Sequence, residues 1–140
     1  MCLAKHVLEE LYSNEEGFTL RKHQGDWYTY RNGVYKTISS EALKASITRE
    51  LHGTQIIRAD GKRSGLAVRK ALVEEVVFAL PALGILVEGT TPQWIDADIG
   101  GKPDRWINCK NGILCLNTYE LLPHTIGLFT TRQLPVDYYA

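Results

Sequence analysis

The chain has 140 residues, and its 16 basic side chains balance its 16 acidic ones, so it carries no formal net charge at neutral pH. A nucleic-acid coat protein spreads a strong positive field over its surface, so this balance excludes that class and restricts any DNA contact to a local patch. Hydrophobic residues make up 44% and charged residues 23% of the chain, which excludes intrinsic disorder. The length predicts a single domain over residues 1–140.

Cysteine usage and hydropathy indicate the cellular compartment of the protein. Cys2, Cys109 and Cys115 are an odd number without CxxC spacing, which disfavours a disulfide framework and a zinc site. No apolar run approaches the roughly 20 residues that span a bilayer, and the opening residues are amphipathic rather than signal-like. We therefore expect a cytoplasmic protein with no membrane partner.

The first part of the chain predicts one helix followed by three short strands. Apolar residues at helical spacing indicate a helix over residues 3–14. Phe18–His23 and Trp27–Arg31 are rich in aromatic and β-branched residues, and Asn32-Gly33 suits the positive φ angles of a type I′ hairpin turn.

A second helix follows, with leucine and isoleucine at intervals of four. Ser39 or Ser40 can cap its start, and Gly53 suits a left-handed stop. The glycine-rich segment Thr54–Gly65 is expected to be a loop that can contain a brief strand.

The remaining chain predicts one more helix and mainly β structure after it. Leu66–Leu80 has an apolar stripe on one side, whereas Ala82–Asp104 has few periodic signals and is expected to be mainly loop. Asn111-Gly112 between apolar runs predicts a second hairpin, and a terminal strand is expected over Thr130–Val136. The expected class is α+β, with helices packed against small antiparallel hairpins and a winged-helix-like core left open.

Counting outward from the second turn gives the expected register of that hairpin. Cys109 pairs with Leu114, and Cys115 lies on the opposite face of the sheet. We therefore expect two packing thiols rather than a shared metal or disulfide.

The same counting on the first hairpin places Tyr28, Tyr30, Tyr35 and Thr37 on one face. An exposed tyrosine stripe could stack on single-stranded bases. Aromatic cross-strand pairs also stabilise sheets, and we favour this second interpretation.

One segment concentrates positive charge beside glycines, with Asp60 as its single acidic residue. Cations on a loop that leads into a helix can neutralise a nucleic-acid backbone, and the helix dipole adds to the attraction. A solvated loop is the alternative. The candidate DNA-binding residues are Arg58, Lys62, Arg63, Arg69 and Lys70.

Catalytic and metal-binding patterns are weak. No phosphate loop is present, because Gly61-Lys62 lacks the glycine that the GxxxxGK[ST] pattern requires five residues earlier. Asp96 and Asp98 resemble a metal-binding carboxylate pair but lack a third ligand, and the four histidines are scattered. We expect no catalytic residue, metal or cofactor in this chain by itself.

The final third, read as WIDAD, RWINCKNGILCLNTYELLPH and FTTRQLPVDY, resembles the domain that precedes the superfamily-3 helicase in phage and plasmid primases and in the poxvirus helicase-primase. GDWYTYRNGVYK resembles the earlier aromatic hairpin of that family. Cys115 and Tyr119 depart from the family's pattern. The residues that fit it are Trp106, Asn108, Asn111, Gly112, Leu116, Leu122, Pro123, His124, Thr131, Leu134, Pro135, Asp137 and Tyr138.

The resemblance implies a fragment of a larger replication protein. Its parent would be an ATP- and Mg²⁺-dependent DNA helicase, primase or both, forming a homo-oligomeric ring in the cytoplasm of a bacterial host if phage or plasmid encoded. Its partners would be the downstream superfamily-3 helicase domain and single-stranded or forked DNA. The expected function is a non-catalytic module that supports ring assembly and DNA engagement. The alternatives are a protein-interaction collar or adaptor without DNA binding, and a metal-dependent phosphotransfer enzyme using Asp96 and Asp98.

Overall fold

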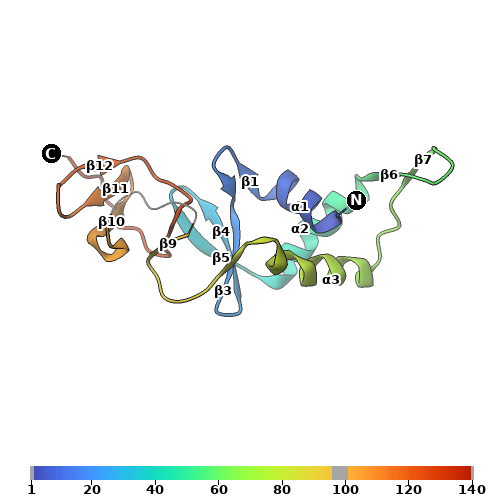
Figure 1. Ribbon diagram of the computed structural model, residues 1–140, viewed down its shortest axis with the longest axis horizontal. Coiled ribbons are helices and arrows are strands. Elements are labelled where there is room, and N and C mark those ends of the chain that lie inside the picture. The colour runs from blue at the N-terminus through green and yellow to red at the C-terminus, as the bar shows by residue number, and fades with distance from the viewer. Residues whose placement is uncertain (1, 96–100, 140) are drawn as a thin grey trace.

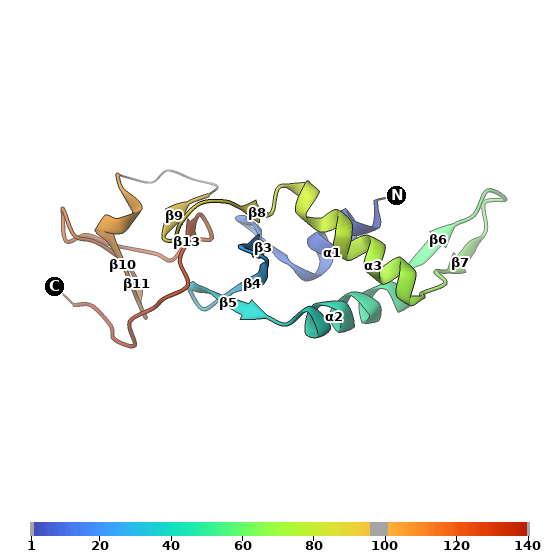
Figure 2. The ribbon, with the colours of Figure 1, turned by 90° about the horizontal axis from the view of Figure 1, so that it is seen from below.

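A computed structural model describes residues 2–95 and 101–139 and shows an elongated molecule (Figure 1). Three helices lie on one side of a central sheet, and smaller sheets extend from both ends (Figure 2). The helices are α1 (Leu3–Leu11), α2 (Ser40–His52) and α3 (Lys70–Ala79). The central sheet has the order β5-β4-β3-β8, formed by β3 (Leu20–His23), β4 (Asp26–Arg31), β5 (Val34–Ile38) and β8 (Leu86–Val87). The expected α+β class, with helices against small antiparallel hairpins, is confirmed.

The remaining elements are short. Two 3-10 helices are η1 (Leu80–Leu83) and η2 (Pro103–Arg105). The small sheets pair β1 (Ser13–Asn14) with β2 (Gly17–Phe18), β6 (Gln55–Ile57) with β7 (Arg63–Gly65), and β9 (Gln93–Trp94) with β13 (Leu128–Phe129). A three-stranded sheet near the C-terminal end contains β10 (Trp106–Cys109), β11 (Gly112–Cys115) and β12 (Leu121–Leu122).

The main hydrophobic core joins the three helices to one face of the central sheet. All three helices contribute apolar residues at helical spacing, so the amphipathic stripes of the sequence become one buried cluster. Its fully buried members are Val7, Leu8, Leu20, Leu43, Ile47, Leu51, Leu80 and Ile85.

The tyrosine stripe lies on the other face of the sheet, and the pairing of Tyr28 with Thr37 and of Tyr30 with Tyr35 confirms that these residues share one face. Phe129 covers this face, with its ring centroid 4.8 Å from that of Tyr35 and 5.5 Å from that of Tyr28. Tyr35 and Phe129 are fully buried. The stripe is therefore a second core cluster and not an open base-stacking platform.

Residues 82–104 contain strands that their aperiodic sequence did not indicate. β8 pairs in parallel with β3, where Lys22 lies opposite Leu86 and His23 opposite Val87. A run of two residues is too short to show a period, and its place in the sheet depends on a partner about 64 residues away. The described residues of this stretch are mainly loop, as expected, but β8 makes the central sheet not purely antiparallel.

The first and third helices are shorter than expected. α1 ends at Leu11, because Ser13 and Asn14 turn back to pair with Gly17 and Phe18 in β1 and β2. α3 begins at Lys70 instead of Leu66, since the Leu66 N–H bonds the Thr54 carbonyl and extends the preceding hairpin.

The boundaries of α2 agree with the sequence, but its end has a different cause. Ser39 caps the start by accepting a hydrogen bond from the Ala42 N–H at 3.0 Å. Gly53 has φ −84°, so the expected left-handed stop is wrong. The hydroxyl of Thr54 supports the end of the helix instead, because it donates to the Glu50 carbonyl at 2.9 Å, an oxygen that also accepts from the Gly53 N–H.

The second Asn-Gly hairpin forms with a register shifted by two residues. Cys109 lies opposite Gly112, so Lys110 and Asn111 occupy the turn. Gly112 has φ 153° and passes so close to β12 that a side chain would collide with the Leu122 carbonyl. A shift of two residues preserves the faces of each strand, so the prediction that Cys109 and Cys115 point to opposite sides is confirmed.

The expected strand over Thr130–Val136 does not form. The segment runs beside β10 and makes two backbone hydrogen bonds, Leu134 N–H to Asn108 O and Lys110 N–H to Val136 O, both at 2.8 Å. Pro135 lies between them and has no N–H to continue a ladder.

The C-terminal third is attached to the central sheet at the tip of the first hairpin. Asn32 has φ 52° and Gly33 φ 83°, as a type I′ turn requires. The Asn108 amide donates to the Gly33 carbonyl at 2.8 Å, and the Gln133 amide donates to the Asn32 carbonyl at 2.9 Å. The turn thereby joins β4 and β5 to β10 and the last segment of the chain.

His124 packs over the same turn. Its Nε2 lies 2.7 Å from the Cys109 carbonyl, and a Cβ at Gly33 would come within 2.5 Å of the imidazole ring. Gly33 is therefore required both for its backbone conformation and for this close contact.

We predict that Gly33→Ala destabilises the fold more than Gly25→Ala does. Both glycines have φ 83° in tight turns, but a Cβ at Gly25 meets nothing within 4 Å. The backbone strain, about 1–2 kcal/mol, is shared by the two variants, and only Gly33→Ala adds a collision with His124. Urea unfolding should show a difference of at least about 1 kcal/mol, and equal losses would contradict the docking role of the turn.

Candidate nucleic-acid interface

The segment expected to be a basic loop is a projecting β-hairpin. β6 and β7 extend from the helical end of the molecule, away from β10–β12 (Figures 1 and 2). Its tip is ordered by hydrogen bonds from the Arg58 N–H to the Lys62 carbonyl at 2.8 Å and from the Lys62 N–H to the Asp60 carboxylate at 3.0 Å. We call residues 55–65 the arm.

Three of the candidate cations lie together on the arm. Arg58, Lys62 and Arg63 are exposed, and within the part of the chain that the structure describes none of their side chains has an ion-pair partner. Asp60 is the acidic residue of this tip, and its carboxylate faces the backbone of the turn. The arm therefore presents uncompensated positive charge.

The other two candidates lie at the base of the arm. Arg69 and Lys70 stand at the start of α3 and line a pocket of about 260 Å³ between α2 and α3. Lys44 of α2 lines the same pocket and adds a third cation. Lys70 also forms an exposed pair with Glu74 at 3.8 Å, a contact worth about 0.3–0.5 kcal/mol that leaves its ammonium available.

The structure thus divides the five candidates into an arm group and a base group. Sequence reasoning missed Lys44, because it lies 25 residues before Arg69 and only the packing of α2 against α3 brings the two together. Helical periodicity could have placed Lys44 on the polar side of α2, but it does not show which helix packs beside α2.

The residues of the C-terminal pattern are mainly structural. Asn108 and His124 hold the Asn32-Gly33 turn, as described above. Asn111 fixes the chain end by donating to the Tyr138 carbonyl and accepting from the Tyr138 N–H, both at 2.9 Å. Trp106 meets Trp94 edge to face, with ring centroids 5.8 Å apart.

The pKa values of Tyr30 and Cys115 are shifted by their surroundings. Burial, with a smaller effect of Glu16, raises the pKa of Tyr30 to about 12, so its phenol stays protonated at neutral pH. Hydrogen bonding from the Thr118 hydroxyl lowers the pKa of the Cys115 thiol.

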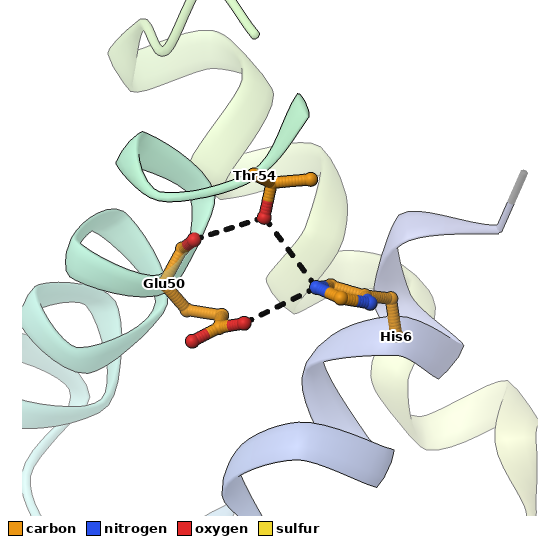
Figure 3. Close-up of polar contacts among 3 residues, drawn as sticks. All are labelled: His6, Glu50 and Thr54. Carbon is orange, nitrogen blue, oxygen red and sulfur yellow. Dashed lines mark hydrogen bonds and ion pairs between the residues drawn. The ribbon is translucent and has the colours of Figure 1, made fainter. Parts of the chain in front are cut away.

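One polar cluster has the composition of a catalytic triad but not its geometry (Figure 3). His6 Nε2 lies 3.2 Å from the Glu50 carboxylate and 3.4 Å from the Thr54 hydroxyl. A triad histidine uses one ring nitrogen for the acid and the other for the nucleophile, whereas here a single nitrogen meets both. The Thr54 hydroxyl already donates to the Glu50 carbonyl, so the cluster ties α1 to the end of α2.

No metal site is found among residues 2–95 and 101–139, where no group of three histidine, cysteine or acidic side chains could hold an ion. Asp96 and Asp98 lie outside the described residues. No helix in the described part of the chain is long and apolar enough to cross a bilayer.

Comparison with known proteins places the chain in one family. No curated protein matches the sequence. The model of the family described as D5 N terminal like matches residues 5–140, nearly the whole chain, and in this family the domain is followed by a helicase domain. The chain therefore belongs to the D5 N-terminal-like family, which forms the N-terminal domain of phage, plasmid and poxvirus primase-helicase proteins.

Proposed function

We propose that this chain is a non-catalytic accessory domain of a larger primase-helicase and engages DNA during replication through the arm and its base. The observation that carries the proposal is the cluster of three exposed cations on a projecting hairpin, none of which has an ion-pair partner among the described residues. Lysine and arginine that neutralise phosphates release counterions from DNA, which favours binding without reading the base sequence. A chain with no net charge can still bind in this way, because the positive charge is local.

The base of the arm extends the same surface. Arg69 and Lys70 lie where the first N–H groups of α3 are free of helical partners, and Lys44 stands beside them. A phosphate there would meet cations and the positive end of a helix dipole. The backbone of one DNA strand could thus follow the arm to its base.

Support for ring assembly comes from the family alone. Its domains precede a helicase domain, and ATP and Mg²⁺ would be used by that motor in the parent protein. We propose that the domain docks on the motor and helps to set the ring.

Removal of the arm cations tests the contact between the arm and DNA. Changing Arg58, Lys62 and Arg63 to alanine should weaken binding to forked DNA at least about tenfold at low salt, because three phosphate contacts are lost. Fluorescence anisotropy over a salt series measures this, and the slope of log K against log salt should fall by about 2–3.

A matched control removes three exposed cations from other surfaces, in the variant Arg49→Ala, Lys102→Ala, Lys110→Ala. It should keep most of the affinity and slope, since the net charge changes equally but no arm contact is lost. If both triple variants bind alike, the arm is not the DNA contact. If the unchanged chain does not bind DNA at low salt, the adaptor interpretation replaces DNA engagement.

Removal of Lys44, which the sequence did not single out, tests the base of the arm. Lys44→Ala should lower the salt slope by about 0.7–0.9, the effect of one phosphate contact. Arg49→Ala on the same helix is the control, because Arg49 is exposed but does not line the pocket between α2 and α3. If the two variants have equal slopes of log K against log salt, the base of the arm is not part of the DNA interface.

A further inference from the structure

A wide groove lies at the other end of the molecule from the arm. It has a volume of about 1110 Å³ and is lined by the start of β5, Thr91-Pro92, β10 and the segment 130–134. β10 and the arm stand at opposite ends of the elongated molecule (Figure 1). Four segments that are far apart in the sequence thus form one surface.

The charge of the groove favours an anionic occupant. Lys36 and Arg132 line it, both are exposed, and among the described residues neither side chain has an ion-pair or hydrogen-bond partner. Among the described residues that line it, Asp104 is the one acidic side chain. Because lysine and arginine are the usual partners of phosphate, the groove can accept a charged backbone.

The groove also contains an aromatic ring that is held in place. Trp106 lies in β10, opposite Cys115 of β11, and meets Trp94 at an interplanar angle of 82°. The Trp94 indole is fixed in turn by its hydrogen bond to the Gly101 carbonyl at 3.0 Å. A partly exposed ring held in this way is a ready partner for a nucleic-acid base, at little further entropic cost.

The walls of the groove are ordered before any ligand arrives. The Asn108 amide bonds the carbonyls of Gly33 and Arg132, and the Thr130 hydroxyl also bonds the Arg132 carbonyl. These bonds hold the segment that carries Arg132 against the tip of the first hairpin. The Thr131 hydroxyl has no hydrogen bond within the described residues and can serve a ligand.

We propose that this groove binds a short segment of single-stranded nucleic acid, with a base against Trp106 and phosphates at Lys36 and Arg132. A single strand fits the chemistry because its bases are free to leave the stack, whereas duplex bases present only their edges. The site extends the proposed function and rests on different residues, so either can fail alone.

The first test changes the charge of the groove. Lys36→Glu with Arg132→Glu should weaken binding of a fluorescent oligothymidylate at least about tenfold at low salt, while duplex binding changes less. The control is Arg49→Glu with Lys110→Glu, which gives the same net charge and should retain most of the oligothymidylate affinity. Equal oligothymidylate affinities for the two double variants would overturn the proposal.

The second test changes the ligand, so that no substitution threatens the fold. An abasic strand of the same length keeps the phosphates but loses the bases, and it should bind at least about fivefold more weakly than oligothymidylate. Equal affinities for oligothymidylate and the abasic strand would show that no base stacks on Trp106, and would overturn the proposal. An acidic peptide that binds the groove when oligothymidylate does not would assign the site to a protein partner.

Both measurements are repeated in the alanine variant of the arm, which separates the two ideas. That variant should lose affinity for forked DNA and still prefer oligothymidylate to the abasic strand. If the preference disappears together with the arm cations, the single strand is bound by the arm and not by the groove.

Discussion

The fold of the C-terminal third depends on the contact between the Asn32-Gly33 turn and the side chains above it. A hairpin tip exposes carbonyl groups that its own strands cannot satisfy, and here the amides of Asn108 and Gln133 bond them. His124 can close over the turn because Gly33 has no side chain. The contact joins β10–β12 to the central sheet and positions the walls of the proposed groove.

This arrangement explains why the polar residues of the family pattern are not the residues proposed to contact DNA phosphates. The side chains of Asn108, Asn111 and His124 form hydrogen bonds with the backbone of other segments. Such side chains need fixed partners at fixed distances and so require particular residue types. The arm, in contrast, needs only exposed cations on a projecting hairpin, which many sequences can supply.

The two proposed contact areas have different chemistry. The arm and its base offer cations without an aromatic ring, which suits a phosphate backbone in duplex or single-stranded form. The groove combines Lys36 and Arg132 with Trp106, which suits an unstacked base. A domain with one area at each end could contact both parts of a forked substrate, ahead of the helicase domain that follows it in this family.

The sequence by itself determined the features that depend on near neighbours along the chain. The Ser39 cap, the Asn32-Gly33 turn, the tyrosine face and the opposite orientation of Cys109 and Cys115 follow from local spacing and were predicted correctly. The basic segment and the family pattern were also evident, because residue identity alone shows them. These features use interactions within a few residues or across one turn.

Tertiary structure decided the rest, because the partners lie far apart in the sequence. β8 is a strand only through β3, Lys44 joins Arg69 only through helix packing, and the Phe129 ring converts the tyrosine stripe into core. The second hairpin turns at Lys110 and Asn111 because Gly112 must pass beside Leu122. Local propensity cannot reveal these positions, since the free energy that fixes them comes from long-range burial and backbone pairing.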